Sequence, residues 1–337
     1  MKKVLVSGYI GFNNFGDEAI FYALSTHLKS LGCEVSVLCK NKKEVRKNYQ
    51  VKAYNFKDFF QVIEALLSCD TLISGGGSLL QNKTINFSLI YYLLIILLVK
   101  IFLKKTIIFA QGIEKINGAF FEFITKLVLK TCNFICVRDE NSKEYLEDLN
   151  IDSLLVSDPV YSLVQDDEII QNKDGLVVQL RDFKNLNKGF VVDLAKAISK
   201  NYQGNIKVFS FQKEYDDEIC LSFIEELKKN NLEAEFISQQ NIEDTIKIIK
   251  SAKYVISTRL HGLILSSAVQ SKTFALIYDE KIRTLSNELN LENIDLYNYS
   301  FDEINEKINK FFNENQEIRY NYRRFCWECI DVSLGVN

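Results

Sequence analysis

Residues 254–268 read Tyr-Val-Ile-Ser-Thr-Arg-Leu-His-Gly-Leu-Ile-Leu-Ser-Ser-Ala. The stretch predicts a buried strand, a short turn and a helix. Arg259 and His261 then lie between strand and helix, where free backbone N–H groups and the helix dipole favour an anion. Arginine adds a planar fork that suits carboxylate or phosphate. We therefore expect an anion site around Arg259, Leu260, His261 and Gly262, with Arg259 and His261 exposed to a cleft. The alternative is a structural ion pair or cap.

Apolar strand-like runs alternate with helix-like segments on both sides of this stretch. Such alternation predicts parallel sheets that are covered by helices on both faces. The strand-like runs are Val4–Gly8, Glu34–Cys39, Thr71–Ser74, Thr106–Ala110 and Phe134–Val137 in the first half, and Gly175–Leu180, Ile206–Phe211, Ala234–Ile237, Tyr254–Ser257 and Phe274–Tyr278 in the second.

The two series predict an α/β protein of two Rossmann-like, doubly wound domains in a GT-B-like arrangement. Ligands are expected in the interdomain cleft, at the carboxyl ends of the strands. A polar stretch near residues 160–174 interrupts the pattern and favours a first domain over 1–165 and a second over 166–310. Residues 311–337 are expected to pack back on the first domain, and one long helix is expected over about 302–330, including Trp327.

Composition excludes several classes of protein. Of the 337 residues 47% are hydrophobic and 25% charged, the values of a globular protein, and the net charge of −3 gives no basic field for nucleic acid. The N-terminal Met-Lys-Lys-Val-Leu-Val enters a strand pattern without a signal peptide, which points to the cytoplasm. Cys326-x-x-Cys329 lacks a second pair or a nearby histidine, so no metal site is expected.

The segment Phe87–Leu103 is apolar except mainly for Lys100. As a helix it would be about 25 Å long, shorter than the ~30 Å hydrocarbon core of a bilayer. We expect a buried or interface-lying helix rather than a membrane span. Lysines at 83, 100, 104 and 105 also suit peripheral contact with an anionic membrane surface.

Other strand-like runs end in residues suited to a binding site. Asn14 and Asp17 follow the first run, and Gly75, Gly76 and Gly77 follow a later one; glycines let backbone approach a ligand closely. Their alternatives are a helix-capping charge for Asp17 and a tight turn for the glycines. Arg138, Arg181 and Lys281 are candidate cations at strand ends. The alternatives are structural ion pairs or surface positions.

These segments together resemble the polysaccharide pyruvyl transferase family, particularly its CsaB-like cell-wall branch. The resemblance spans nearly the whole chain in the expected order. Two departures are Gln179, where related sequences often have serine, and Glu280, where proline is usual. The resembling pieces are G-Y-I-G-F-N-N-F-G-D-E at 8–18, I-S-G-G-G-S-L-L-Q at 73–81, A-Q-G-I at 110–113, V-R-D-E-N-S at 137–142, D-P-V at 158–160, S-T-R-L-H-G at 257–262 and Y-D-E-K at 278–281.

The resemblance implies phosphoenolpyruvate as donor and a pyruvate ketal across two sugar hydroxyls as product. It implies a lipid-linked cell-wall saccharide as acceptor, with N-acetylmannosamine as the sugar, a cytoplasmic enzyme at the inner face of the membrane, and no cofactor. Arg138, Arg259 and His261 would bind the donor's anionic groups. Lys281 and His261 would bind phosphate and donate a proton, and Asp17 would orient or deprotonate the acceptor hydroxyl.

Two other functions fit the same residues. A nucleotide-sugar glycosyltransferase of this fold would bind a nucleotide diphosphate at the helix that begins near Leu260. A non-catalytic sugar-binding protein would keep the fold alone. Retention of a nucleotide, of phosphoenolpyruvate or of sugar alone distinguishes these functions.

Overall fold

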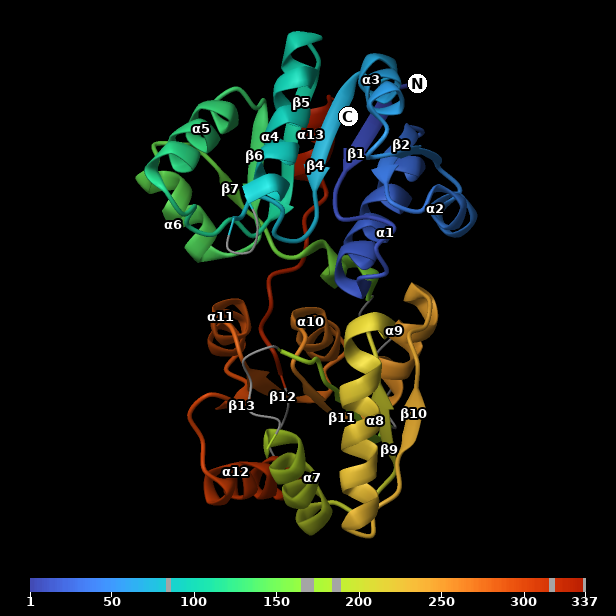
Figure 1. The fold of residues 1–337 in the computed structure, drawn as a ribbon, viewed down its shortest axis with the longest axis vertical. Helices are drawn as coiled ribbons and strands as arrows, with labels where there is room; N and C mark the ends of the chain where they lie inside the picture. The colour runs from blue at the N-terminus through green and yellow to red at the C-terminus, as the bar shows by residue number, and fades with distance from the viewer. Residues whose placement is uncertain (83–85, 165–172, 184–188, 315–318, 336–337) are drawn as a thin grey trace. The chain divides into compact units, whose positions relative to one another are not determined.

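The computed structural model of the protein describes residues 1–82, 86–164, 173–183, 189–314 and 319–335. The chain forms two compact units (Figure 1). The first contains Met1–Leu163 and Arg323–Asn337, and the second contains Val164–Tyr322. Residues 311–322 therefore group with the second unit, which extends beyond the predicted boundary at 310.

The described part of the first unit has a seven-stranded parallel sheet with the order β3-β2-β1-β4-β5-β6-β7. Its strands are apolar runs because helices cover both faces. The strands are β1 (Lys3–Ser7), β2 (Glu34–Cys39), β3 (Lys52–Asn55), β4 (Thr71–Gly75), β5 (Lys105–Gln111), β6 (Phe134–Val137) and β7 (Leu154–Leu155). The helices are α1 (Phe15–Ser30), α2 (Lys42–Tyr49), α3 (Phe59–Ser68), α4 (Asn86–Ile101), α5 (Ala119–Leu129), α6 (Glu140–Asp148), the 3₁₀ turn η1 (Pro159–Leu163) and α13 (Glu328–Leu334).

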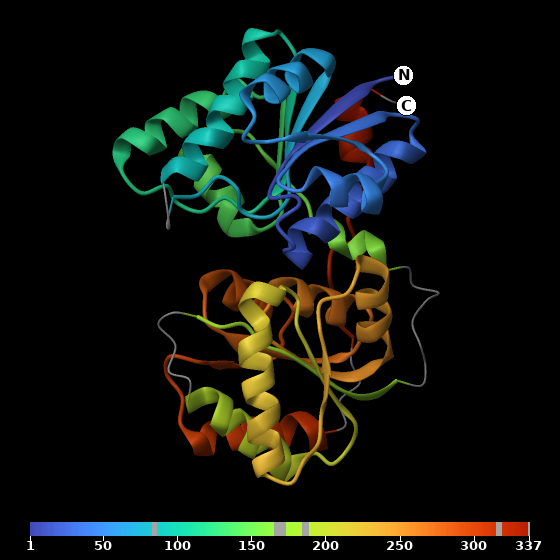
Figure 2. The ribbon, with the colours of Figure 1, turned by 45° about the vertical axis from the view of Figure 1, so that its right-hand side comes forward.

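The second unit repeats this design with a six-stranded parallel sheet in the described residues, ordered β10-β9-β8-β11-β12-β13. Figure 2 shows α8, in yellow, lying over its strands. The strands are β8 (Asp174–Gln179), β9 (Ile206–Phe209), β10 (Glu235–Ile237), β11 (Ala252–Ser257), β12 (Lys272–Ile277) and β13 (Glu292–Asp295). The helices are α7 (Gly189–Asn201), α8 (Lys213–Lys229), α9 (Ile242–Ser251), α10 (Leu260–Ala268), α11 (Glu280–Glu288) and α12 (Phe301–Asn313).

Each sheet reverses its strand order at one place. In the first unit β2 and β3 lie to one side of β1, whereas β4 to β7 lie to the other; in the second unit the reversal falls between β8 and β11. In such sheets the loops after the two central strands separate and leave a crevice at their carboxyl ends. The predicted fold class, two doubly wound Rossmann-like domains, is therefore confirmed.

The single long helix expected over about 302–330 is wrong. α12 ends at Asn313, α13 begins at Glu328, and the described residues between them are not helical. Ile304, Ile308 and Phe311 of α12 are fully buried, and this apolar spacing stops after Phe312 in the sequence. A helix there would have no apolar stripe to bury.

The C-terminal residues pack on the first unit. The Trp327 ring stacks on His27 of α1, with ring centres 4.2 Å apart, and also lies against Phe109 of β5. His27 Nε2 lies 2.7 Å from Oδ1 of Asp331 in α13. His27 therefore contributes to packing between α1 and the C-terminal residues.

The apolar segment Phe87–Leu103 is largely helical, as predicted, and forms most of α4. Leu89, Ile96 and Val99 of this helix are completely buried on its inner side, whereas Phe87 and Leu94 are exposed on its outer side. Among the described residues, no helix has both the length and the apolar character needed to cross a membrane.

Candidate functional site

Arg259 lies at the point where β11 ends and α10 begins, beside the reversal of the second sheet. Its backbone N–H donates to Ser257 Oγ over 2.9 Å. Gly262, in the first turn of α10, lies so close to Ser257 that a Cβ would collide with that hydroxyl. Leu260, the first residue of α10, is half-buried. The motif therefore holds the helix tightly against the end of its strand.

The Arg259 side chain is buried, not exposed as the sequence predicted. Its Nη2 donates to Asp216 Oδ1 over 2.5 Å, and the two side chains are 7% and 0% exposed. Burial lowers the pKa of Arg259 and raises the pKa of Asp216, while their attraction opposes both shifts. The structural ion pair, which was the alternative for Arg259, is thus present.

Asp216 belongs to a buried hydrogen-bond network that ties the loops together. Its Oδ2 accepts from the backbone N–H groups of Phe211 and Gln212, at 3.1 and 3.0 Å. Gln179 donates to the same oxygen over 3.4 Å and accepts from Ser257 Oγ over 2.7 Å. Gln179, a departure from the family pattern, therefore joins the end of β8 to the end of β11.

The other candidates in the second unit surround this network at the same edge of the sheet. Arg181 follows β8, its guanidinium carbon is 5.9 Å from the ring centre of Phe183, and Phe183 stacks on Tyr278. His261 is half-buried in the first turn of α10. Lys281 is 42% exposed in the first turn of α11, and its Nζ lies 3.6 Å from Oδ2 of Asp279.

In the first unit, the first turn of α1 and the loop after β4 meet at Asp17 and Gly77. Gly77 has a φ of +68°, and a Cβ on it would collide with the Asp17 carboxylate. Asn14 donates to Asp17 Oδ2 over 2.6 Å. Gly76 also has a positive φ, of +92°, whereas Gly75 is the last residue of β4. The glycines therefore allow an acidic side chain to lie directly against backbone.

Glu18, the neighbour of Asp17, is buried and holds the loop after β1. It accepts from the Gly11 N–H over 2.7 Å and from the Tyr49 hydroxyl over 2.5 Å. Burial raises the pKa of Glu18 to about 7 in spite of these two hydrogen bonds.

Arg138, which follows β6, also forms a buried ion pair. Its Nη1 donates to Asp158 Oδ2 over 2.8 Å, and the two side chains are 7% and 4% exposed. The next residue, Asp139, caps α6 by accepting from the Ser142 N–H. Arg138 lies in the first unit, whereas Arg259, with which the sequence analysis grouped it, lies in the second.

The two helices that begin at the strand-order reversals are not capped by side chains. Asn14 and Arg259 occupy the N-cap positions of α1 and α10, and neither makes a capping hydrogen bond. Asp139 and Asp279, by contrast, cap α6 and α11, whereas α5 and α8 also begin without a side-chain cap. An uncapped helix start keeps its partial positive charge and its donors for an external anion. The start of α10 is therefore suited to phosphate or carboxylate.

A sequence profile of the polysaccharide pyruvyl transferase family matches residues 14–280. The chain belongs to this family. It is a transferase, and the match includes every candidate residue named above from Asn14 to Gly262 but ends one residue before Lys281. No curated protein matches the chain.

Several solved structures resemble the transferase in fold. Examples are UDP-GlcNAc 2-epimerase from Neisseria meningitidis bound to UDP-GlcNAc (12% identity, TM-score 0.64, 100% of both chains) and S. aureus MnaA with UDP (10% identity, TM-score 0.64, 93% of this chain and 88% of that one). Another is Acinetobacter baumannii MurG (11% identity, TM-score 0.57, 93% and 91%). At such low identity the likeness shows the fold alone.

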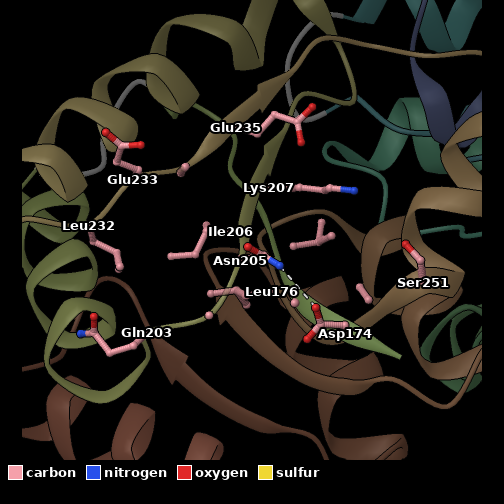
Figure 3. A pocket seen from close by; sticks show the side chains of 15 residues that line it. Asp174, Leu176, Gln203, Asn205, Ile206, Lys207, Leu232, Glu233, Glu235 and Ser251 are labelled. Carbon is pink, nitrogen blue, oxygen red and sulfur yellow. Dashed lines mark hydrogen bonds between the residues drawn. The ribbon is translucent and has the colours of Figure 1, made fainter. Parts of the chain in front are cut away.

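A hollow of about 940 Å³ lies at the opposite edge of the second sheet of the transferase. Residues at the amino ends of the strands line it, including Asp174 of β8 and Ala252 of β11. Figure 3 shows Asp174 beside Asn205, which donates to it over 3.3 Å. None of the candidate residues lines this hollow, so we place the site at the carboxyl edge, where charge and helix starts coincide.

The sequence pointed to no role for Asp216 and Asp158 of the transferase, although the structure shows both in buried ion pairs. Asp216 was not singled out, and Asp158 was only part of the D-P-V motif at 158–160. Each is a buried acid that holds a candidate arginine. No sequence pattern marks either acid, because partners distant in sequence cannot be paired from one chain.

Proposed function

We propose that the transferase moves the pyruvyl group of phosphoenolpyruvate onto two hydroxyls of one sugar in a cell-surface polysaccharide precursor. The product is a pyruvate ketal, and phosphate is released. The observation that carries the proposal is the uncapped start of α10 beside the buried Arg259, in a chain of this family. Phosphoenolpyruvate presents phosphate and carboxylate on a three-carbon frame, which needs cations and N–H donors at fixed angles.

The donor side is assigned to the second unit. The start of α10, with Arg259 and His261, binds the phosphate. Arg181 follows β8 and Lys281 follows β12, the strands on either side of β11, and both supply further positive charge. Asp216 is a positioning residue, because it fixes the guanidinium of Arg259 without needing to touch the donor. Leu260 supplies its backbone N–H at the helix start, and Gly262 lets this start pack closely against Ser257.

The acceptor side is assigned to the first unit. Asp17 orients a sugar hydroxyl and accepts its proton, with Asn14 holding the carboxylate and the glycines 75–77 leaving room for the sugar. Arg138, paired with Asp158, supplies fixed positive charge at this edge. The acceptor we propose is a lipid-linked saccharide containing N-acetylmannosamine, which the enzyme meets in the cytoplasm at the inner face of the membrane.

The reaction balances without a cofactor. A proton adds to the methylene carbon of the donor while the first sugar hydroxyl adds to the central carbon and loses its proton. The bond from that carbon to the phosphate oxygen then breaks. The second hydroxyl attacks the same carbon and loses its proton, which closes the ketal ring. His261 or Lys281 is the proton donor to the methylene carbon or to the departing phosphate.

The test is incubation of the purified protein with phosphoenolpyruvate and a panel of lipid-linked disaccharides. We expect one equivalent of phosphate per product, and a mass gain equal to pyruvic acid minus water. Parallel reactions contain UDP-sugars instead of phosphoenolpyruvate. Addition of a sugar from UDP-sugar, with no pyruvyl product on any acceptor, would overturn the proposal in favour of a glycosyltransferase.

A further inference from the structure

Three helices of the first unit carry apolar side chains on their outer sides as well as their inner sides. α4 lies between α3 and α5 (Figure 1), and the inner sides of all three pack into one core cluster. On the outer sides, exposed apolar residues recur at the spacing of one helix face. We call these residues the outer apolar surface: Phe60 and Leu67 of α3, Phe87 and Leu94 of α4, and Phe123 and Leu127 of α5.

The composition of α4 shows why this surface is unusual. Lys100 is its one charged residue, so the helix is apolar all round. Leu89 and Ile96 are completely buried, yet Phe87 is 76% exposed and Leu94 is 52% exposed. A helix that is apolar on every side is normally covered on every side, by protein or by lipid. A contiguous apolar patch on a surface marks a place of interaction.

The charges around the outer apolar surface indicate what covers it. Exposed lysines flank the three helices: Lys57 precedes α3, Lys105 follows α4 and Lys130 follows α5. Each of the two carboxylates within these helices is engaged by a neighbour, Glu64 with Lys52 and Glu122 with the Tyr145 hydroxyl. Asp58 and Asp70, which flank α3, accept from the backbone N–H groups of Gln61 and Lys3. The surface is therefore apolar, with exposed lysines at its border.

We propose that the outer apolar surface docks the protein on a bilayer that contains anionic phospholipids. The phenyl rings enter the boundary between headgroups and acyl chains, and the lysines bind the lipid phosphates. A second copy of the chain is a poorer occupant, since a two-fold pairing of this surface would bring its basic borders together.

The direction of the helices relates this surface to the candidate site. Helices that connect parallel strands begin at the carboxyl edge of the sheet, so Phe60, Phe87 and Phe123 lie toward the edge that carries Asp17 and Gly77. If the proposed function is right, a lipid-linked acceptor held in the same bilayer approaches that edge. Docking itself does not depend on the reaction.

Flotation of the full chain with vesicles tests the docking. We expect binding to vesicles of phosphatidylcholine with phosphatidylglycerol, and little binding to phosphatidylcholine alone. Replacing Phe87 or Phe123 with serine lowers the partition coefficient about tenfold each. Replacing Lys105 or Lys130 with glutamine lowers it about fivefold each. Val332→Ser is the matched control, because Val332 is 70% exposed on α13, outside this surface.

The outcomes separate docking from folding and from catalysis. Each variant keeps the melting temperature of the parent because the replaced side chains are exposed, and each keeps transfer to a water-soluble acceptor. Equal binding of the parent and of the phenylalanine variants to anionic vesicles would overturn the proposal. So would a stable dimer, seen by sedimentation, that these variants dissociate while no vesicle binding occurs. Failure of pyruvyl transfer to every acceptor, with docking intact, would instead reject the proposed function.

Discussion

Nη2 of Arg259 donates to Oδ1 of Asp216 over 2.5 Å, and this pair lies almost completely out of contact with solvent. The geometry fixes the guanidinium at the start of α10, where a flexible exposed arginine would have to be ordered by the ligand. It also changes what mutation is expected to do. An exposed Arg259, as the sequence predicted, could be removed without loss of the fold, but removal of one member of a buried pair leaves the other charge unpaired.

We predict that Arg259→Ala and Asp216→Ala each lower the free energy of unfolding by about 3–5 kcal/mol. The double variant is expected to lose less than the sum, since it leaves neither charge buried alone. Urea unfolding of the four proteins measures the coupling. Strictly additive losses would show that the two side chains do not stabilise each other.

Arg259→Lys tests the donor site without removing the charge. Lysine keeps a cation opposite Asp216 but lacks the planar fork, so we expect a folded protein with strongly reduced transfer. Phosphate release at saturating acceptor, together with the melting temperature, separates the two effects. Near-normal turnover by a folded Arg259→Lys protein would remove the guanidinium from the donor site.

His261→Ala and Lys281→Ala are predicted to fold normally and to lose most of their transferase activity. His261 is half-buried, and Lys281 is 42% exposed with only a 3.6 Å contact to Asp279, so neither contributes much to stability. Lys247→Ala is the matched control, because Lys247 forms a comparable exposed pair with Asp244 on α9. Normal turnover in the Lys281 variant would confine the donor site to residues within the family match.

Much of the fold follows from the sequence because buried parallel strands are continuous apolar runs. Glu34–Cys39 and Phe134–Val137 were predicted with the bounds that the structure has. β3 (Lys52–Asn55) and β13 (Glu292–Asp295) were missed, since these strands are short and mix polar with apolar residues. The helix over 302–330 was wrong because its apolar spacing ends near Phe312.

The position of the candidate residues in the fold was predictable from the sequence, but their contacts were not. Strand ends followed by glycine, arginine or histidine correctly marked the carboxyl edge of each sheet, where Asp17 and Arg259 lie. The state of each side chain depends on partners distant in sequence: Asp216 is 43 residues from Arg259, and Asp158 is 20 residues from Arg138. Helix and strand periodicity carries no information about such pairs.

Gly77→Ala is predicted to impair transfer by displacing Asp17. A Cβ at this position would collide with the Asp17 carboxylate, and the φ of +68° adds a backbone cost of about 1–2 kcal/mol. Gly32→Ala is the matched control, because Gly32 has a φ of +72° and no atom within 4 Å of the added Cβ. Both variants should incur the same backbone cost, but only Gly77→Ala should also displace Asp17 and lose activity. Equal activities would show that Asp17 tolerates displacement or has no catalytic role.

Treatment with EDTA is predicted to leave transfer unchanged. Among the described residues, no group of three or more His, Cys, Asp or Glu side chains is placed to hold a metal ion. The cationic side chains proposed for the donor site neutralise the phosphate instead. Initial rates before and after chelation, followed by addition of single divalent ions, check this. A loss that one particular ion restores would contradict it.

Glu18 is predicted to make the folded protein less stable as the pH rises. Burial raises its pKa from 4.5 to about 7, so the folded state holds a proton that the unfolded state releases earlier. Below pH 4.5 Glu18 is protonated in both states, so it causes no change of the free energy of unfolding with pH. Between pH 4.5 and 7 the free energy of unfolding falls, by about 3 kcal/mol in total from this group, and above pH 7 the loss is complete.

Glu18→Gln is uncharged and keeps an acceptor for the Gly11 N–H. Urea unfolding at pH 5 and pH 8 should therefore show a smaller decrease in this variant than in the parent. An equal decrease in the two proteins would place the titrating group elsewhere.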